Sequence, residues 1–241
     1  MSPTGRPKGE YRSAQHEGGP VNLLGILGGT FDPIHCGHVE LAREVRSALG
    51  LSAVRLVPAG DPPHRAAPVA PAAHRLAMVE LAIEGVPGLE VDAREIARSG
   101  RSYTVPTLEE LRAEVPARPL ALIVGADAFA GLPTWHRWTE LFALAHLIVV
   151  ARPGHMLDPS GLAPSLAAEW AARLAGDAVA LAQSGSGRIF VQPITPRPVS
   201  ASAIRAELAA GHRDAVRGLL PPAVLAYIDR NQLYRPHPDA T

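Results

Sequence analysis

The fold is decided near the amino end of the chain, where residues 23–38 read LLGILGGTFDPIHCGH. Leu23 to Leu27 form a short apolar run that predicts a buried strand. Gly28 and Gly29 follow this run and are typical of a tight turn. Apolar residues then recur with helical spacing from Val39 to Leu49. The stretch therefore predicts a strand, a turn and a helix, the first unit of an α/β protein.

Strands and helices continue to alternate along the chain. Further buried strands are predicted at 53–57, 89–91, 120–124, 146–151 and 188–193. Helices are predicted at 72–83, 107–115, 141–145, 201–210, 214–219 and 222–230. Such alternation implies right-handed crossovers and a parallel sheet that is covered on both faces. We therefore expect a Rossmann-like, doubly wound α/β fold with a small helical segment at its C-terminal end.

Two segments depart from this alternation. Residues 1–20 are polar and rich in Gly and Pro, without the apolar core of a signal peptide, so we expect a disordered leader. Residues 154–187 contain a helical stretch at 162–174 and a Gly/Ser run at 184–187, which favours a surface insertion. Residues 21–241 are otherwise predicted to form one domain, with 200–235 as its C-terminal helical part.

Composition excludes several classes of protein. Lys+Arg and Asp+Glu number 23 each, so the chain has no net charge that would attract nucleic acid or a membrane surface. The single cysteine, Cys36, excludes an intramolecular disulfide framework. No apolar run reaches the roughly 20 residues that span a bilayer. We therefore expect a cytoplasmic protein that binds any anionic ligand through local groups.

The turn after the first strand carries residues suited to an anion. Ligands of parallel sheets bind outside the carboxyl ends of the strands. Gly28 and Gly29 let a ligand approach the backbone closely. Gly37 lets a phosphate settle against the N–H groups at the start of the helix. His35 and His38 lie three residues apart, so one helical turn can aim both side chains at the same anion.

Other roles for these residues stay open. A His pair at this spacing can bind a metal, although no third ligand is near in sequence. Cys36 can be a nucleophile with a low pKa or a small packing residue. His-x-x-His alone is most often a pair of ordinary loop histidines. A dinucleotide fingerprint is excluded because Gly-x-Gly-x-x-Gly is absent from this turn.

The whole run from Gly28 to His38 resembles the signature of the His-x-Gly-His nucleotidyltransferase superfamily. Together with later stretches, it resembles the bacterial nicotinate-nucleotide adenylyltransferase family from about Leu24 to Arg235. The later stretches are Pro62-Pro63-His64-Arg65, Ser102-Tyr103-Thr104, Gly125-Ala126-Asp127 with Pro133-Thr134-Trp135, and Ser200 to Arg205. The resemblance implies adenylyl transfer from ATP to nicotinate mononucleotide, which gives nicotinate adenine dinucleotide and pyrophosphate in NAD biosynthesis.

The resemblance also implies which residues bind ATP. His35, His38, His64, Arg65 and Arg205 are expected to act on the phosphates at the reacting centre. The other expected ATP contacts are Gly28, Gly29, Thr30, Phe31, Gly37, Ser200, Ser202 and Ile204. The family usually has Thr at position 202 and often Lys at position 65. Ser200 is also a plausible plain N-cap of the last helices, a role compatible with phosphate binding.

A second set of residues is implied for the acceptor nucleotide. It comprises Asp32, Thr104, Gly125, Asp127, Trp135, His136 and Arg152. Trp135 is expected to stack on the pyridine ring, while backbone N–H groups near Thr104 and His136 receive the nicotinate carboxylate. The family often has Tyr at position 136, which puts the role of that side chain in doubt. Asp127 is expected at the ribose, with an N-cap for a helix at 128–131 as the alternative.

The expected chemistry needs no general base, because the acceptor phosphate is already an oxyanion at pH 7. Mg²⁺ is expected to be held mainly by the substrate phosphates, with no protein metal site. Nicotinamide mononucleotide stays open as the acceptor, as does a non-catalytic nucleotide-binding sensor. The sequence also leaves a homo-oligomer open.

Overall fold

The computed structural model describes residues 21–63, 67–151 and 158–235. The expected leader, residues 1–20, lies outside the described residues. A sheet of six parallel strands runs through the molecule in the order β3-β2-β1-β4-β5-β6. The strands are β1 (Val21–Gly29), β2 (Leu51–Pro58), β3 (Leu89–Val91), β4 (Leu120–Gly125), β5 (His146–Ala151) and β6 (Ile189–Pro193). The prediction of a doubly wound α/β fold is confirmed.

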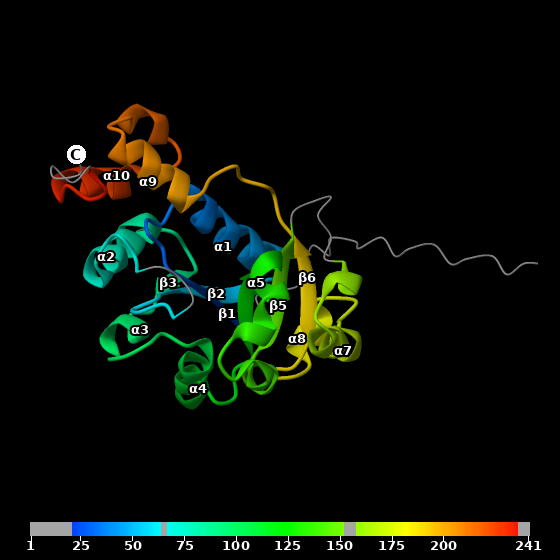
Figure 1. The fold of residues 1–241 in the computed structure, drawn as a ribbon. Helices are drawn as coiled ribbons and strands as arrows, with labels where there is room; N and C mark the ends of the chain where they lie inside the picture. The colour runs from blue at the N-terminus through cyan, green and yellow to red at the C-terminus, as the bar shows by residue number, and fades with distance from the viewer. Residues whose placement is uncertain (1–20, 64–66, 152–157, 236–241) are drawn as a thin grey trace, which may run out of the picture.

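Helices cover both faces of this sheet (Figure 1). On one face lie α1 (Cys36–Ala48), α2 (Ala72–Ile83), α8 (Val179–Ala182), α9 (Ala201–Ala209) and α10 (Pro222–Arg230). On the other lie α4 (Thr104–Glu114), α5 (Ala126–Ala130), α6 (Leu141–Leu144) and α7 (Pro164–Arg173). The short α3 (Arg94–Ala97) joins β3 to α4, and 3₁₀ turns occupy η1 (Leu132–Thr134), η2 (Trp138–Glu140), η3 (Pro159–Gly161) and η4 (Arg213–Val216).

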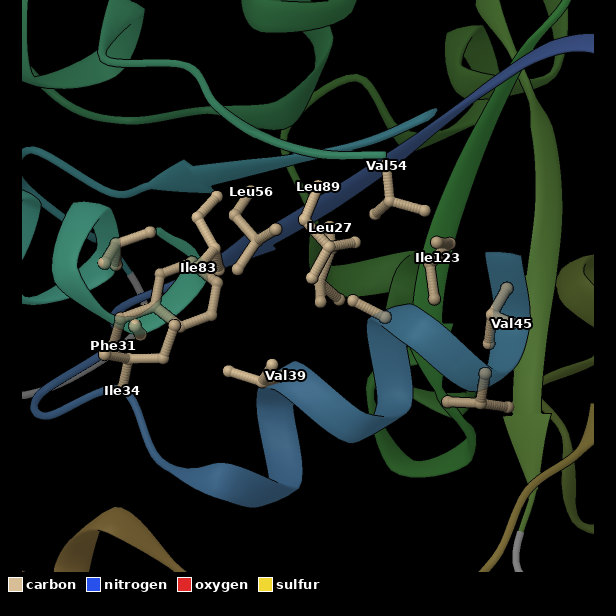
Figure 2. Packing of buried hydrophobic residues seen from close by; sticks show 14 of the residues in the cluster. Leu27, Phe31, Ile34, Val39, Val45, Val54, Leu56, Ile83, Leu89 and Ile123 are labelled. Carbon is tan, nitrogen blue, oxygen red and sulfur yellow. The ribbon is translucent and has the colours of Figure 1, made fainter. Parts of the chain in front are cut away.

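Successive residues of the central strands enter opposite apolar layers, because side chains alternate along a strand. In β4, Ala121 and Ile123 face one layer, while Leu122 and Val124 face the other. Figure 2 shows the first layer, where Leu27 of β1 packs between α1 and α2. Burial on both faces explains why these strands read as unbroken apolar runs in the sequence.

The segment that was expected to be a surface insertion packs against the sheet instead. It is the connection between β5 and β6, and in its described part α7 buries Leu166 and Trp170 in the second apolar layer. Leu181 of α8 is buried in the first layer. The other side of α7, the start of the described segment and most of the Gly/Ser run are open to solvent. A connection between parallel neighbours must pass over the sheet, and these apolar residues of α7 and α8 cover opposite faces of it.

Several predicted helix boundaries shift by one to three residues, and two of the differences have a clear physical cause. The helix expected at 107–115 begins at Thr104, because Pro106 lies in the first turn, where a helix needs no N–H donor. The helix expected at 214–219 is a single 3₁₀ turn, Arg213–Val216, which ends before Gly218 with its φ of 78°.

The strand order places a topological switch point between β1 and β4. The chain leaves β1 on one side to form β2 and β3, then returns to form β4 on the other side of β1. Connections therefore diverge from the carboxyl ends of β1 and β4, and ligands of doubly wound sheets bind in the crevice that this opens. Gly28 and Gly125 lie at these two strand ends and are both exposed.

Candidate active site

The turn after β1 is shaped by a close approach between Gly29 and Phe31. A Cβ atom on Gly29 would lie 2.9 Å from the Phe31 ring, so only glycine fits there. Phe31 itself has a φ of 50°, an uncommon conformation for an aromatic residue, and its ring is buried in the core. Gly28, in contrast, has no atom within 4 Å of an added Cβ among the described residues. The predicted ATP contact of Phe31 is thus limited to its backbone, while Gly28 presents open backbone.

The two histidines of the motif stack on each other at the start of α1. The His35 and His38 rings have centroids 3.6 Å apart and are inclined by 17°. The backbone N–H of His35 donates to Nδ1 of His38 at 3.2 Å. A neutral His38 with this acceptor carries its proton on Nε2, which makes Nε2 a hydrogen-bond donor. Phe31 contacts the His38 ring edge-on, at a centroid distance of 5.1 Å.

His35 is the buried member of the pair. Burial lowers the pKa of His35 from 6.5 to about 4, against the opposing effect of a backbone hydrogen bond. Its Nδ1 atom is buried and has no hydrogen-bond partner in the part of the chain that the structure describes. His35 is therefore neutral at physiological pH. An orphaned polar atom at the start of a helix, in a residue that lines a cleft, indicates a functional group more than a packing residue.

Cys36 does not have the surroundings of a nucleophile. Burial and the neighbouring Glu40 charge raise the pKa of the Cys36 thiol. A thiol with a raised pKa is poorly nucleophilic near pH 7. Of the two alternatives for Cys36, the small packing residue fits the structure.

Donors from two distant segments of the chain hold the Asp32 carboxylate. Its carboxylate accepts hydrogen bonds from the backbone N–H groups of Val69 and Ala70, at 2.8 and 3.1 Å, and from the Tyr234 hydroxyl at 2.7 Å. The residue is 5% exposed. Burial raises the pKa of Tyr234, which keeps that hydroxyl protonated as a donor. Protein donors thus occupy both carboxylate oxygens, and a contact between Asp32 and the acceptor nucleotide stays a prediction.

Arg205 connects α9 to the turn after β1. Its Nη1 donates to the carbonyl oxygen of Asp32 at 2.6 Å, and its Nη2 donates to Oγ of Ser202 at 3.3 Å. The Ser200 hydroxyl caps α9 by accepting from the N–H of Ala203 at 3.2 Å, as the N-cap interpretation predicted. Ser200 and Ser202 are exposed, whereas the side chain of Ile204 is fully buried in the core. Ile204 thus anchors α9, and its side chain does not face ATP.

The start of α1 and the segment before α9 enclose a small cleft. Its volume is about 140 Å³, and it is lined by His35, Gly37, His38 and Leu41 on one side and by Ile194, Thr195, Pro196, Arg197 and Val199 on the other. A Cβ on Gly37 would lie 2.6 Å from Cγ1 of Val199, so glycine at position 37 is needed for this close approach. The cleft therefore lies between the predicted phosphate-binding start of α1 and the segment that leads into α9.

Residues predicted to bind the acceptor lie on two loops that meet. Tyr103 and His136 have ring centroids 4.5 Å apart, which brings the start of α4 to the loop after η1. Thr104 opens α4, whose N-cap Tyr103 makes no side-chain capping bond. Trp135 is half-buried and packs against the core at its inner side. These contacts place Thr104, Trp135 and His136 in one neighbourhood.

Asp127 lies near the carboxyl end of β4, in the first turn of α5. The N-cap of that helix is Gly125, so the alternative role of Asp127 as an N-cap is wrong. Asp127 is exposed, and its carboxylate has no hydrogen bond within the described ranges. Three other predicted site residues, His64, Arg65 and Arg152, lie outside the described residues.

Arg75 was missed by reasoning from the sequence. It is 1% exposed, although it carries a charge, and it donates to carbonyl oxygens of the loops around the motif. The one available signal was a single Arg within the apolar repeat of α2. Such a residue is usually read as an exposed side chain with an apolar stem.

No group of three or more His, Cys, Asp or Glu side chains is arranged to hold a metal ion in the described ranges. Among the described helices, none is both long and apolar enough to cross a membrane.

Comparisons with known proteins agree with this geometry. The cytidylyltransferase-like family model matches residues 26–207. A probable nicotinate-nucleotide adenylyltransferase of Laribacter hongkongensis is 50% identical over 217 residues, which cover 90% of this chain and 96% of the relative. A protein of the same name from Aeromonas hydrophila is 49% identical over 214 residues, covering 88% and 97%.

A solved structure shares the fold at low sequence identity. It is Plasmodium falciparum nicotinic acid mononucleotide adenylyltransferase complexed with NaAD, with a TM-score of 0.67 and 16% identity. The match covers 88% of this chain and 97% of that chain. Long matches at about 50% identity, together with the histidine pair at the switch point, show that the chain belongs to the nicotinate-nucleotide adenylyltransferase family.

Proposed function

We propose that this protein transfers the adenylyl group of ATP to nicotinate mononucleotide, with release of pyrophosphate. The observation that carries the proposal is the stacked His35–His38 pair at the start of α1, beside the switch point of the sheet. Arg205 reaches the same turn from α9, where it also contacts the Ser202 hydroxyl. The names of the relatives support nicotinate mononucleotide as the acceptor.

On the ATP side, the site supplies hydrogen-bond donors and two arginines, Arg205 beside the turn and Arg197 in the lining of the cleft. His35 is neutral because its pKa is lowered to about 4, so it offers no charge to the phosphates at neutral pH. Positive charge comes from the guanidinium groups of these two arginines and from the N–H dipoles at the start of α1. The Nε2–H of His38 is suited to stabilise charge that develops on the α-phosphate or the leaving pyrophosphate.

On the acceptor side, the chain has to orient a nucleophile that is already ionised. The acceptor phosphate needs placement in line with the α-phosphorus of ATP, and no proton has to be removed from it. Thr104 and its neighbours offer N–H groups at an uncapped helix start, which suit the nicotinate carboxylate. Trp135 and His136 border the same neighbourhood. Roles for Asp127, His64, Arg65 and Arg152 remain predictions from the family.

The family's divalent cation, proposed to be Mg²⁺, fits this site as a companion of the substrate. The Asp32 carboxylate is occupied by three protein donors, so it is not an open ligand. The polar side chains that line the cleft are His35, His38, Thr195 and Arg197, without a carboxylate among them, and histidine and arginine donors suit phosphate oxygens. Mg²⁺ held by the phosphates would neutralise part of their charge and keep several waters. We propose that the reaction takes place in the cytoplasm.

The test is pyrophosphate release with ATP and Mg²⁺, with nicotinate mononucleotide or its amide supplied at equal concentration. We expect turnover with the acid and much weaker turnover with the amide, because an amide exchanges a charged acceptor for a neutral one and adds a donor. Equal rates would retain adenylyl transfer and remove the proposed selectivity. No release with either acceptor would contradict the proposed function.

A further inference from the structure

Arg75 is a buried cation that binds three backbone carbonyls from separate loops. Its Nη1 donates to Thr30 at 2.8 Å, its Nη2 donates to Gly60 at 2.9 Å, and its Nε donates to Ala70 at 3.2 Å. In the described ranges it forms no ion pair with a carboxylate within 4.0 Å. Burial lowers the pKa of Arg75, while the nearby Asp32 charge opposes this shift.

Each of the three carbonyls belongs to a segment at the carboxyl end of the sheet. Thr30 follows β1 and lies five residues before His35. Gly60 follows β2 and leads into the Pro62-Pro63 corner. Ala70 precedes α2 and also donates its N–H to Asp32. Arg75 and Asp32 therefore hold Ala70 from its two sides, and Arg75 joins that residue to both strand-end turns.

The geometry of these contacts requires a guanidinium. Three donors fixed in one plane can reach three carbonyls in different directions, whereas a lysine ammonium is a single point at the end of a flexible stem. Burial of a charge costs much free energy unless all of its hydrogen bonds are made. In the folded protein, Arg75 therefore holds the three carbonyls at defined positions. The turn that carries the histidine pair is one of the parts held in this way.

We propose that Arg75 is a positioning residue for adenylyl transfer, because it sets the turn after β1 relative to the turn after β2. This inference rests on the proposed function. Arg75 is buried beneath the turns and acts through Thr30 and Gly60, without contacting substrate itself. A shift of about 1 Å between reacting groups can lower a rate by about 100-fold. Replacement of the Arg75 guanidinium should therefore slow the chemical step more than it weakens substrate binding.

The chain offers a matched control in Arg112 of α4. Its Nη1 donates to the carbonyl of Arg118 at 2.7 Å, and its Nη2 donates to those of Leu144 and Gly185 at 2.6 and 3.0 Å. These carbonyls precede β4, β5 and β6, at the end of the sheet away from the histidine pair. Burial lowers the pKa of Arg112 as well. The two arginines thus make the same kind of contact at opposite ends of the sheet.

The experiment compares Arg75→Lys with Arg112→Lys in the full chain. For each we would measure kcat, KM for ATP and for nicotinate mononucleotide, and Tm, with assays run well below the lowest Tm. We expect Arg75→Lys to lower kcat by about 10- to 100-fold while each KM changes by less than about 3-fold. We expect Arg112→Lys to lower Tm and leave kcat within about 2-fold of wild type.

Several outcomes would overturn the inference. One is a wild-type kcat in folded Arg75→Lys, and another is an equal loss of kcat in Arg112→Lys. If Arg75→Lys does not fold, Arg75→Gln is tested next, and failure of both to fold while Arg112→Lys remains folded would show a purely structural role. The wild-type enzyme assayed alongside separates the two proposals. Its inactivity would contradict the proposed function, whereas an active wild type with an equally active Arg75→Lys would remove only the role of Arg75.

Discussion

Each end of the parallel sheet carries an arginine that binds backbone carbonyls and a buried histidine, but the two histidines differ. At the amino end, His146 is fully buried, accepts from the N–H of Arg188 at Nδ1 and donates to the carbonyl of Ser184 from Nε2. At the carboxyl end, Nδ1 of buried His35 has no partner among the described residues. A ring whose two nitrogens are hydrogen-bonded within the protein contributes to stability. A ring nitrogen without such a partner, in a residue that lines a cleft, is suited to bind a ligand.

The largest difference in kcat is expected between alanine variants of a histidine at the carboxyl end of the sheet and of one at the amino end. We expect His38→Ala to lower kcat by about 100-fold or more, since removal of one transition-state donor costs about 2.7–4 kcal/mol. We expect His146→Ala to leave kcat unchanged and to lower the free energy of unfolding by about 1–3 kcal/mol, because two buried backbone groups lose their partner. Steady-state kinetics and urea unfolding of both variants check this. Near-normal turnover in His38→Ala would remove its proposed role.

A smaller effect should separate two glycines that both have room for a methyl group. Gly28 at the carboxyl end and Gly185 at the amino end have no described atom within 4 Å of an added Cβ. We expect Gly28→Ala to lower kcat/KM by about 10-fold without a change in Tm, because the methyl group enters the space of a ligand that approaches the backbone. Gly185→Ala is the control and should change neither quantity. Equal kinetics in the two variants would argue against a ligand beside Gly28.

A third variant tests the contact between α1 and the segment before α9. In Gly37→Ala, the added methyl would overlap Val199, so the two segments must separate. We expect a loss of about 1–3 kcal/mol in the free energy of unfolding, typical of overpacking, together with a KM for ATP raised several-fold. Val199→Ala in the same chain removes the overlap and should restore much of the KM. Unchanged kinetics in Gly37→Ala would show that this cleft is not used.

The smallest effect concerns pH. Burial lowers the pKa of both His35 and His146 below 6.5, so the unfolded chain binds protons more readily than the folded one. The free energy of unfolding should therefore be highest above pH 6.5 and decrease as the pH drops below that value. The contribution of His35 to this decrease should continue down to about pH 4. The slope is at most about 1.4 kcal/mol per pH unit for each group.

Urea unfolding between pH 8 and pH 5 checks this dependence. His35→Gln and His146→Gln should each flatten the decline, because each removes one titrating group. The kcat of His146→Gln should follow the wild-type pH profile, since that ring lies away from the reacting groups. A decline that is as steep in both variants as in wild type would show that other groups control it.

Much of the fold could be predicted because local patterns determine it. The range of α2, Ala72–Ile83, and the strand Leu89–Val91 agree with the prediction residue for residue. The strands are buried on both faces and so read as apolar runs between turn residues. The segment after β5 could not be read in this way. Whether Leu166 and Trp170 are buried depends on the face of the sheet that the connection crosses, which sequence spacing does not reveal.

The site could be predicted in part. The run from Gly28 to His38 located the switch point, because its residues are adjacent in the chain. The role of Asp32 could not be read from that run, since its partners lie 37 residues away at Val69 and 202 residues away at Tyr234. Arg75 was hidden for a similar reason. A lone arginine in a helix looks the same whether it reaches solvent or three buried carbonyls.

The hydrogen bond between Tyr234 and Asp32 has a consequence for synthesis on the ribosome. Asp32 is translated 202 residues before the hydroxyl that binds it. At about 5–20 residues per second, this interval lasts about 10–40 s. Through that time the first strand and its turn exist without their last partner, with the carboxylate held by water or by Val69 and Ala70 alone. The turn after β1 therefore completes its hydrogen bonds only after 202 further residues have been synthesised, which delays a competent nucleotide site by at least that interval.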